Sequence, residues 1–453
     1  MLQSFVSRVT RVARPLNKSN GFRFQTKNSA LQGSQLRFAS GLSLKEQAMR
    51  PSSLSSLTAD INVWGLDLPF TRALVEMHGE FSGMVPSCCP VQPLSPSGKR
   101  SKESSWLEIL LPFTDGKCNM KESMVNYGGK NVRYGKLFEV IDSLAGDVGY
   151  RHCRGCDDIT IVTASVDGMS ISAVDDITTD NDLVLQAFLT YVGRSSMEIH
   201  VNLISADKLI ACTQFIMVAR HGVDGGAYEI PGLEVTSQAD KDEFTRGQVR
   251  AAGRKYDAKN SLAIVPPKQE EVEMIHHLHL RSKGLKAQKR ALLMNREGTE
   301  KTRHFKYMKS TLLNSPEIMH PQNRNVHGKV FGGEIMRKSF EMAYITAACF
   351  IGRDNTRFVA VDDINFILPV NVGSIMIFTG QITYCEGTEV VVLVTVEECE
   401  AESMERTRTN QLSYVFKTRD EKLAPEVIPE DYGEFVRFLN GRRTYQDVVN
   451  REK

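Results

Sequence analysis

The amino-acid sequence predicts an α+β fold of two tandem domains, each an antiparallel sheet wrapped around a long central helix. The first observation is the length, because 453 residues are enough for two or three domains. The second is an internal repeat, in which AVDDIT (173–178) recurs as AVDDIN (360–365). The third is that each copy follows a helical stretch and precedes two β-rich runs joined by a turn. A buried helix followed by antiparallel strands, found twice, indicates two domains of one kind.

Residues 134–152 and 332–350 are the two predicted central helices. Apolar side chains recur at helical spacing along both stretches, and both stretches are more apolar than a surface helix. We therefore expect both helices to be largely buried. Small residues in each stretch would let a sheet pack closely against it, namely Ala145, Gly146, Gly149, Ala343, Ala347 and Ala348.

The predicted strands follow each helix as runs rich in β-branched and aromatic residues. The connectors between them carry Gly, Ser, Glu and Thr, as hairpins require. Three matching runs in each half predict two sheets of the same construction. The runs are 183–192, 197–205 and 213–220 in the first half, and 374–384, 389–398 and 410–417 in the second.

Shifts in composition divide the chain further. A polar segment with helical parts separates the two copies, and a proline-rich stretch precedes the first copy. These features predict a targeting peptide at 1–40, an N-terminal arm at 41–98, domain 1 at 99–225, an interdomain linker with helices at 226–304, domain 2 at 305–428 and a C-terminal tail at 429–453.

The N-terminal 40 residues are basic and contain no acidic residue, since the first acid in the chain is Glu46. If residues 4–14 form a helix, Arg8, Arg11 and Arg14 lie on a different face from the apolar side chains. An amphipathic, Arg-rich, Ser-rich and acid-free segment is typical of a mitochondrial matrix-targeting peptide. The alternative is a disordered basic arm, but the pattern favours import into the matrix.

The remaining composition narrows the class of protein. The formal net charge is +2, and no long basic block with interleaved aromatic residues occurs, so nucleic-acid binding is not indicated. No apolar run approaches the roughly 18 residues that a membrane helix needs. Nine irregularly spaced cysteines favour a reducing compartment over a disulfide framework.

Four segments resemble a known family. HPQNRNVHGKVFGGEIMRKSFEMAYITAA (320–348) is similar to the Asn-x-x-Gly…Gly-Gly loop-to-helix motif of hotdog acyl-CoA thioesterases. Segments 132–147, 359–374 and 429–443 resemble the mitochondrial thioesterase 9 branch of that family. The resemblance implies a double-hotdog fold and hydrolysis of acyl-CoA to free fatty acid and CoA. It also implies no metal or other cofactor, and homo-oligomers such as a trimer of double-hotdog chains.

A thioester hydrolase needs a carboxylate to attack or to activate water, donors for the oxyanion, and an apolar slot for the acyl chain. The segment from Asn325 to Gly333 leads into the second helix. Its glycines would let a thioester approach the backbone, and the helix start presents unpaired amides. We therefore expect Asn325 to position the carbonyl or the water, and the amide of Gly332 or Gly333 to hold the oxyanion. Gly328, Phe331 and Gly333 are expected to contact the substrate.

The resemblance also implies where the acid lies, because family members carry it fifteen residues after the Asn and seven after the second Gly. In the second domain that position is Phe340, which cannot act as an acid. In the first domain, the same spacing counted from Gly135 places the acid at Asp142. It places Tyr127 at the position of the Asn. Asp142 and Asn325 would then form one complete site across the domain interface, and the partner site would be inactive. Asp142 would either activate water or attack to form an anhydride.

Other interpretations of these residues stay open. Asp142 could be a hydrogen-bonded helix residue, and Asn325 could be a turn residue. His327 could be a base, although a lone His rarely is. The chain could also be a hotdog enoyl-thioester hydratase, which would want an Asp/His pair in one loop, or a non-catalytic acyl-CoA-binding protein.

Further polar clusters are better explained by structural roles. The acid pairs 175–176 and 362–363 recur in both copies, which favours a role at a strand start. The CxxC at 153–156 has no second copy, and the histidines within 276–279 share one predicted helix. Because a structural zinc site usually needs four such ligands, no metal is expected.

Overall fold

The structure is a computed structural model that describes residues 68–77, 81, 83–116, 120–171, 177–222, 225–262, 264–294 and 305–452. The predicted targeting peptide (1–40) and the first part of the predicted arm lie outside these residues, as do Asp175 and Asp176. Within the described ranges, no helix is both long enough and apolar enough to cross a membrane.

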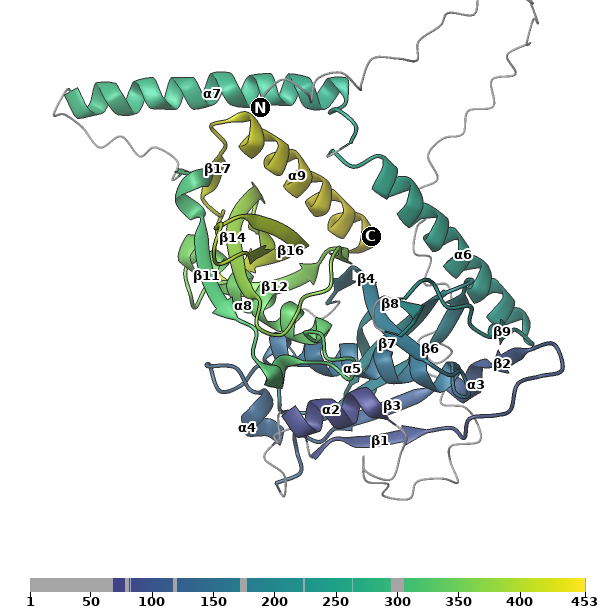
Figure 1. Cartoon of the computed structure of the whole chain (residues 1–453). Helices are drawn as coiled ribbons and strands as arrows, with labels where there is room; N and C mark the ends of the chain where they lie inside the picture. The colour runs from purple at the N-terminus through teal and green to yellow at the C-terminus, as the bar shows by residue number, and fades with distance from the viewer. Residues whose placement is uncertain are drawn as a thin grey trace, which may run out of the picture. The chain divides into compact units, whose positions relative to one another are not determined.

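The first half is an antiparallel sheet around the central helix α5 (Tyr134–His152), as Figure 1 shows. Almost every residue of α5 is buried, because the strands pack against one side of it and other helices against the rest. The strand order is β1-β3-β6-β7-β8-β4, and every neighbouring pair is antiparallel. The strands are β1 (Val85–Cys88), β3 (Leu107–Leu111), β4 (Ile159–Asp167), β6 (Leu183–Val192), β7 (Ser196–Ser205) and β8 (Lys208–His221).

The second half repeats this construction around α8 (Gly332–Ile351). Its strand order is β13-β16-β15-β14-β11, and β12 also pairs with β16. The α+β class, with two hotdog domains of one kind, is therefore confirmed. The strands are β11 (Leu313–Ile318), β12 (Thr356–Val361), β13 (Ile364–Phe366), β14 (Ile375–Glu386), β15 (Glu389–Cys399) and β16 (Arg406–Thr418).

The two halves join through their sheets and through their central helices. β13 pairs with β4, and β12 pairs with the short strand β5 (Met169–Ser170), so the strands form one continuous sheet. α5 and α8 pack against each other. A glycine makes this approach possible, because a Cβ atom on Gly333 would lie 2.8 Å from the Cα atom of Glu139. The start of each helix therefore reaches the middle of the other.

An ion-pair network lies between the two helices. Arg337 of α8 places its Nε atom 2.8 Å from Glu139 Oε1 and its Nη2 atom 2.6 Å from Glu334 Oε2. Both carboxylates are almost fully buried. Since α5 and α8 begin 198 residues apart, Glu139 and Arg337 occupy equivalent positions, as do Lys136 and Glu334. Equivalent positions thus carry opposite charges.

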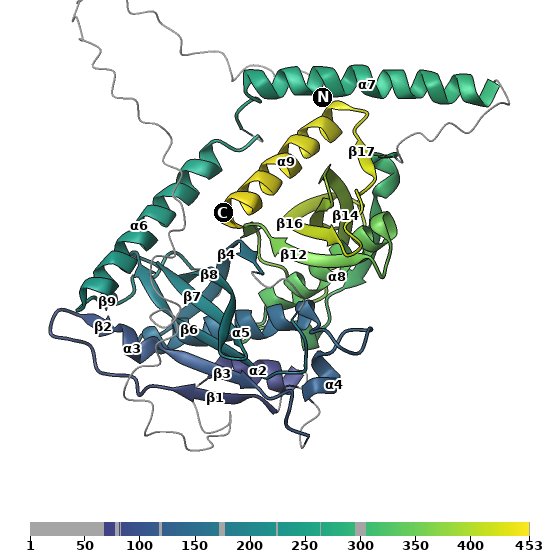
Figure 2. The same cartoon turned by 180° about the vertical axis from the view of Figure 1, so that it is seen from behind.

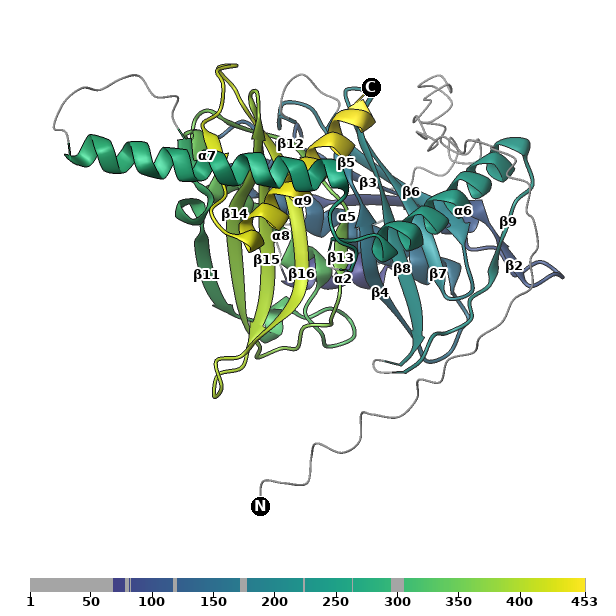
Figure 3. The same ribbon diagram turned by 90° about the horizontal axis from the view of Figure 1, so that it is seen from above.

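Further helices pack on the two halves, and α6 (Gln238–Lys259) and α9 (Tyr432–Glu452) lie against the sheets. α2 (Pro69–Met77) packs on α5 (Figure 2), and α9 lies across β14, β15 and β16 (Figure 3). The predicted linker contains α6 and α7 (Gln269–Met294). Short elements complete the fold: β2 (Lys99–Ser101), α3 (Lys102–Ser105), α4 (Met120–Met124), β9 (Gly232–Glu234), β10 (Phe305–Tyr307) and β17 (Glu426–Ile428).

The predicted central helices and long strands match the observed ones within a few residues. Several short strands were not predicted. β11 is an example, because its sequence LNSPEI contains Pro316 and alternates between half-buried and exposed positions at the edge of the sheet. The part of the predicted arm that is described contributes α2 and β1 to the first half, while the exact domain boundaries stay predictions.

Candidate active site

Asp142 projects from α5 toward the start of α8, across the interface between the halves. Its Oδ2 atom accepts a hydrogen bond of 2.7 Å from the backbone amide of Gly333. Its Oδ1 atom accepts a hydrogen bond of 2.7 Å from the hydroxyl of Thr163 on β4. The carboxylate of one domain therefore caps the helix of the other, where backbone amides carry partial positive charge.

The surroundings of Asp142 change its acidity. The side chain is 2% exposed, and burial raises its pKa to about 6, although the bonds from Thr163 and Gly333 favour the ionised form. A carboxylate with a pKa near 6 is ionised at neutral pH and is a better proton acceptor than an ordinary aspartate. These are the properties that a general base needs.

Gly332 and Gly333 leave room for this carboxylate. A Cβ atom on Gly332 would lie 2.9 Å from Asp142 Oδ2 and 3.5 Å from the ring of Phe366. A Cβ atom on Gly333 would lie 2.5 Å from the ring of Phe331. Because the Gly333 amide already donates to Asp142, the amide of Gly332 is the better oxyanion donor of the two.

The loop before α8 is organised by Asn325. The side-chain Oδ1 atom of Asn325 accepts hydrogen bonds from the backbone amides of His327 (2.9 Å) and Lys329 (3.1 Å). Gly328 sits at the tip of this turn with φ +78°, a conformation that favours glycine. The side-chain oxygen of Asn325 therefore holds the loop in its turn conformation. Gly328 shapes the turn.

Phe331 and His327 pack against groups from both halves. Phe331 is buried at the N-cap position of α8, and its amide donates to the carbonyl of Asn323. The imidazole of His327 lies 3.3 Å from the hydroxyl of Tyr150 and meets the ring of Phe70 edge-on. Burial lowers the pKa of His327, which makes its imidazole a weaker base, and its ring is packed between side chains of the first half.

Comparison with known proteins identifies the family. No protein-family model matches the chain. Mouse mitochondrial acyl-coenzyme A thioesterase 9 is 30% identical over 362 residues, which cover 77% of this chain and 79% of the relative. Mouse mitochondrial acyl-coenzyme A thioesterase 10 gives the same identity and coverage, and the human thioesterase 9 is 29% identical over 360 residues.

The chain belongs to the acyl-CoA thioesterase 9 family. Among solved structures, an acyl-CoA hydrolase from Staphylococcus aureus covers 32% of this chain at 23% identity. Its TM-score of 0.31 is too low to bear on the site described here.

In this thioesterase 9 family member, the first domain has a loop equivalent to the one around Asn325. The Oδ1 atom of Asn126 accepts the amide of Gly128 at 3.0 Å, as Asn325 accepts that of His327, and Gly129 has φ +74°. An isolated β-bridge closes each loop, between Val125 and Val132 in the first domain and between Arg324 and Val330 in the second. The loop of the first domain is therefore one residue longer than that of the second. The equivalent of Asn325 is thus Asn126, and the placement of Tyr127 at that position was wrong. A one-residue insertion explains the error.

The acid position of the partner site is aromatic. Phe340 of α8 is the equivalent of Asp142, and its ring packs at 5.0 Å from the ring of Phe358. Phe358 in β12 is the equivalent of Thr163 in β4, because each is the last residue before a β-bulge in its strand. The polar pair of Asp142 and Thr163 in one site is therefore replaced by two phenylalanines in the other.

The other polar candidates have structural partners. Asp362 accepts the hydroxyl of Thr444 from α9 at 2.7 Å, and Asp363 accepts the amide of Gly168 from the first half at 2.8 Å. Both aspartates therefore tie segments of this family member together. Among the residues that the structure describes, no group of His, Cys, Asp and Glu has an arrangement that could hold a metal ion.

Proposed function

We propose that this chain hydrolyses acyl-CoA thioesters to free fatty acid and CoA, with Asp142 as the reactive carboxylate. As a member of the acyl-CoA thioesterase 9 family, the chain is a thioester hydrolase. The observation that supports the assignment of the site is the buried Asp142 carboxylate, held between Thr163 and the first turn of α8. The proposed reaction uses no metal or other cofactor, because CoA is part of the substrate.

The reaction begins with the ionised Asp142. It takes a proton from a water molecule, whose oxygen attacks the thioester carbonyl carbon. Asn325 positions the water or the carbonyl through its Nδ2 group, and the Gly332 amide donates to the developing oxyanion. The tetrahedral intermediate then collapses, the carbon–sulfur bond breaks, and the CoA thiolate leaves and takes up the proton. Gly328, Phe331 and Gly333 line the approach to these groups.

In the alternative route, Asp142 itself attacks the carbonyl and forms a mixed anhydride, which water then hydrolyses. Label in the Asp142 side chain after turnover in ¹⁸O-labelled water would establish this route. If water attacks the Asp142 carbon of the anhydride, repeated turnover leaves ¹⁸O in the Asp142 side chain, which mass spectrometry of the peptide detects. General-base catalysis incorporates the label into the fatty acid alone.

The test of the site is CoA release from a panel of acyl-CoAs, measured with the wild-type chain, Asp142→Asn and Asn325→Ala. We expect Asp142→Asn to reduce kcat by at least about a thousandfold, because the proton acceptor is lost, and Asn325→Ala to reduce it less. A folded Asp142→Asn chain with a near-normal rate would show that another group drives the reaction.

Two proposals concern the setting of the enzyme. The relatives in the family are named mitochondrial, and we place this chain in the mitochondrion and, from its acid-free basic N-terminus, in the matrix. Protease protection of the chain inside purified mitochondria stripped of their outer membrane tests this. We also propose a homo-oligomer, a trimer of double-hotdog chains, which light scattering coupled to gel filtration would measure as three chain masses.

A further inference from the structure

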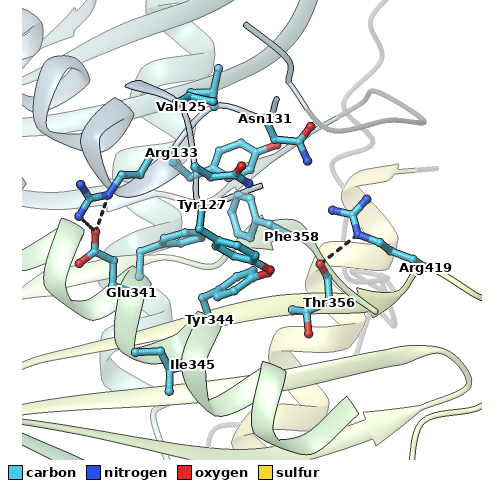
Figure 4. A pocket seen from close by; sticks show the side chains of 14 residues that line it. Val125, Tyr127, Asn131, Arg133, Glu341, Tyr344, Ile345, Thr356, Phe358 and Arg419 are labelled. Carbon is cyan, nitrogen blue, oxygen red and sulfur yellow. Dashed lines mark hydrogen bonds and ion pairs between the residues drawn. The ribbon is translucent and has the colours of Figure 1, made fainter. Parts of the chain in front are cut away.

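A cavity of about 420 Å³ opens at the partner site, where Phe340 replaces the acid. Figure 4 shows this pocket from close by. Its lining comes from the loop of the first domain that contains Asn126, and from α8 and β12 of the second domain. These elements are equivalent to the loop, helix and strand that carry Asn325, Asp142 and Thr163, so the cavity is the counterpart of the proposed active site.

The pocket keeps the binding elements of a hotdog site but lacks the reactive group. The Asn126 loop is present, with the same hydrogen bond from its i+2 amide as in the Asn325 loop. Gly135 is present at the start of α5, as Gly333 is at the start of α8. The equivalent of the Asp142 carboxylate is absent, because Phe340 stands at its position and packs against Phe358. The acid that does line the pocket, Glu341, is ion-paired with Arg133. A thioester bound here would therefore lack the reactive carboxylate of the proposed active site.

The walls of the pocket are aromatic and fixed in place. The hydroxyls of Tyr127 and Tyr344 are 2.7 Å apart, which ties the first-domain loop to α8 along one side (Figure 4). The ring of Tyr134 packs at 5.7 Å from Phe340 and at 4.9 Å from Phe358. A cavity of this size with aromatic walls falls in the range of small-molecule sites and suits an apolar chain.

Cationic groups surround the mouth of this apolar cavity. The guanidinium of Arg353 lies 4.2 Å from the centre of the Tyr127 ring, and a second hollow of about 180 Å³ beside the pocket is lined by Lys130, Arg353 and Arg419. Two acids line these hollows. Glu341 lines the pocket and is ion-paired with Arg133, and Asp354 lines the second hollow. The mouth therefore carries net positive charge, which complements the phosphates of CoA.

We propose that this pocket is a second acyl-CoA site, which holds the acyl and thioester end of the ligand among its aromatic residues without hydrolysing it. The ligand class rests on the proposed function, since the pocket is the counterpart of the proposed catalytic site. The phosphates of CoA lie over the cationic mouth. Each chain therefore binds two ligands and hydrolyses one.

The experiment counts ligands on the full chain. The probe is a CoA thioether with a short alkyl chain, which cannot be hydrolysed, and isothermal titration calorimetry gives the stoichiometry. We expect two ligands per wild-type chain and one per Ile345→Trp chain, because Ile345 lines the pocket, is 51% exposed and can be replaced by a larger ring that fills the space. The matched control is Leu280→Trp on α7, which is 52% exposed and should keep two ligands.

One ligand per wild-type chain would overturn the inference, and so would two ligands on a folded Ile345→Trp chain. If the Ile345→Trp chain fails to fold, the Arg353→Glu chain tests the inference in its place. The side chain of Arg353 is exposed, so the substitution should not disturb the core. We expect it to weaken one of the two ligands by about tenfold, as the loss of one charge-assisted contact does, and unchanged affinities would refute the site. CoA release that depends on Asp142 is measured in a separate assay. A chain that hydrolyses acyl-CoA but binds a single ligand would contradict the second site and leave the proposed function standing.

Discussion

Asp142 of the first domain accepts the backbone amide of Gly333 from the second domain, with 2.7 Å between Oδ2 and the nitrogen. This one contact joins the proposed catalytic acid to the helix start that presents the oxyanion donor. The acid and the donor are fixed relative to each other by the interface between the domains. Small changes on either side of the contact should therefore affect the chemistry.

The rate of hydrolysis should depend on the ionisation of Asp142. Because burial raises the pKa of this carboxyl to about 6, kcat/KM should fall about tenfold for each pH unit below 6 and level off above it. A series of CoA-release rates between pH 4.5 and 8.5 measures this. If the rate instead begins to fall only near pH 4, which is close to the pKa of an ordinary aspartate, the group that controls the rate is not Asp142.

The same carboxylate should lower the stability of the fold at neutral pH. The pKa of Asp142 is about 6 in the folded chain against 3.8 as its ordinary value, so the folded chain binds this proton more tightly. The resulting stabilisation is fully present below pH 4 and is lost as the pH rises through 6, which amounts to about 3 kcal/mol. Asp142→Asn should therefore unfold at a higher denaturant concentration than wild type at pH 8, and the difference should vanish near pH 4. Lower stability of the variant at pH 8 would contradict this.

Thr163→Val tests the partner of the acid on β4. The substitution keeps the shape of the side chain but removes the 2.7 Å hydrogen bond that favours the ionised carboxylate. The acid limb of the pH–rate profile should move up by about one pH unit, since a hydrogen bond to a charged group is lost. The control is Thr160→Val on the same strand, a buried residue that should leave the profile in place. Profiles that do not differ would remove Thr163 from the site.

Gly332→Ala tests the space beside the acid. The added Cβ atom would lie 2.9 Å from Asp142 Oδ2, so the carboxylate or the helix start must move. A displacement of this order can cost about a hundredfold in kcat. Gly253→Ala on α6 is the matched control, because its Cβ atom would meet no heavy atom within 4 Å. Equal rates for the two variants would show that the proposed geometry is not the reactive one.

Arg337→Met tests the network between the central helices. The substitution leaves the buried carboxylates of Glu139 and Glu334 without the cation between them, which should cost about 3–5 kcal/mol in the free energy of unfolding. The double variant Glu139→Met/Arg337→Met should recover much of this loss, because it removes one acid as well. Chemical denaturation of the two variants and the wild type measures the coupling, and additive effects would argue against the network.

The sequence predicted the features that depend on the periodicity of apolar residues. It predicted fewer of the features that depend on the tertiary fold. The helices at 134–152 and 332–351 follow from apolar spacing, and the family resemblance, applied to the matching position in the first helix, led to Asp142. Thr163 could not be found, because its role depends on the point where β4 passes α5. The inserted residue in the first loop was also missed, since loop residues have no periodicity that would reveal a shift of one. The equivalence of Asn126 and Asn325 appears only in their hydrogen bonds.

The opposite charges at equivalent positions of α5 and α8 have an evolutionary consequence. Two copies of the first half paired with each other would place Glu139 against Glu139, and two copies of the second half would place Arg337 against Arg337. Either homodimer would lose the ion pair between Glu139 and Arg337 and would bring like charges together at these two positions. The charge pattern therefore favours the pairing of unlike halves over the pairing of two copies of the same half. The covalent link keeps two unlike halves together, so each half can specialise because its partner is always present.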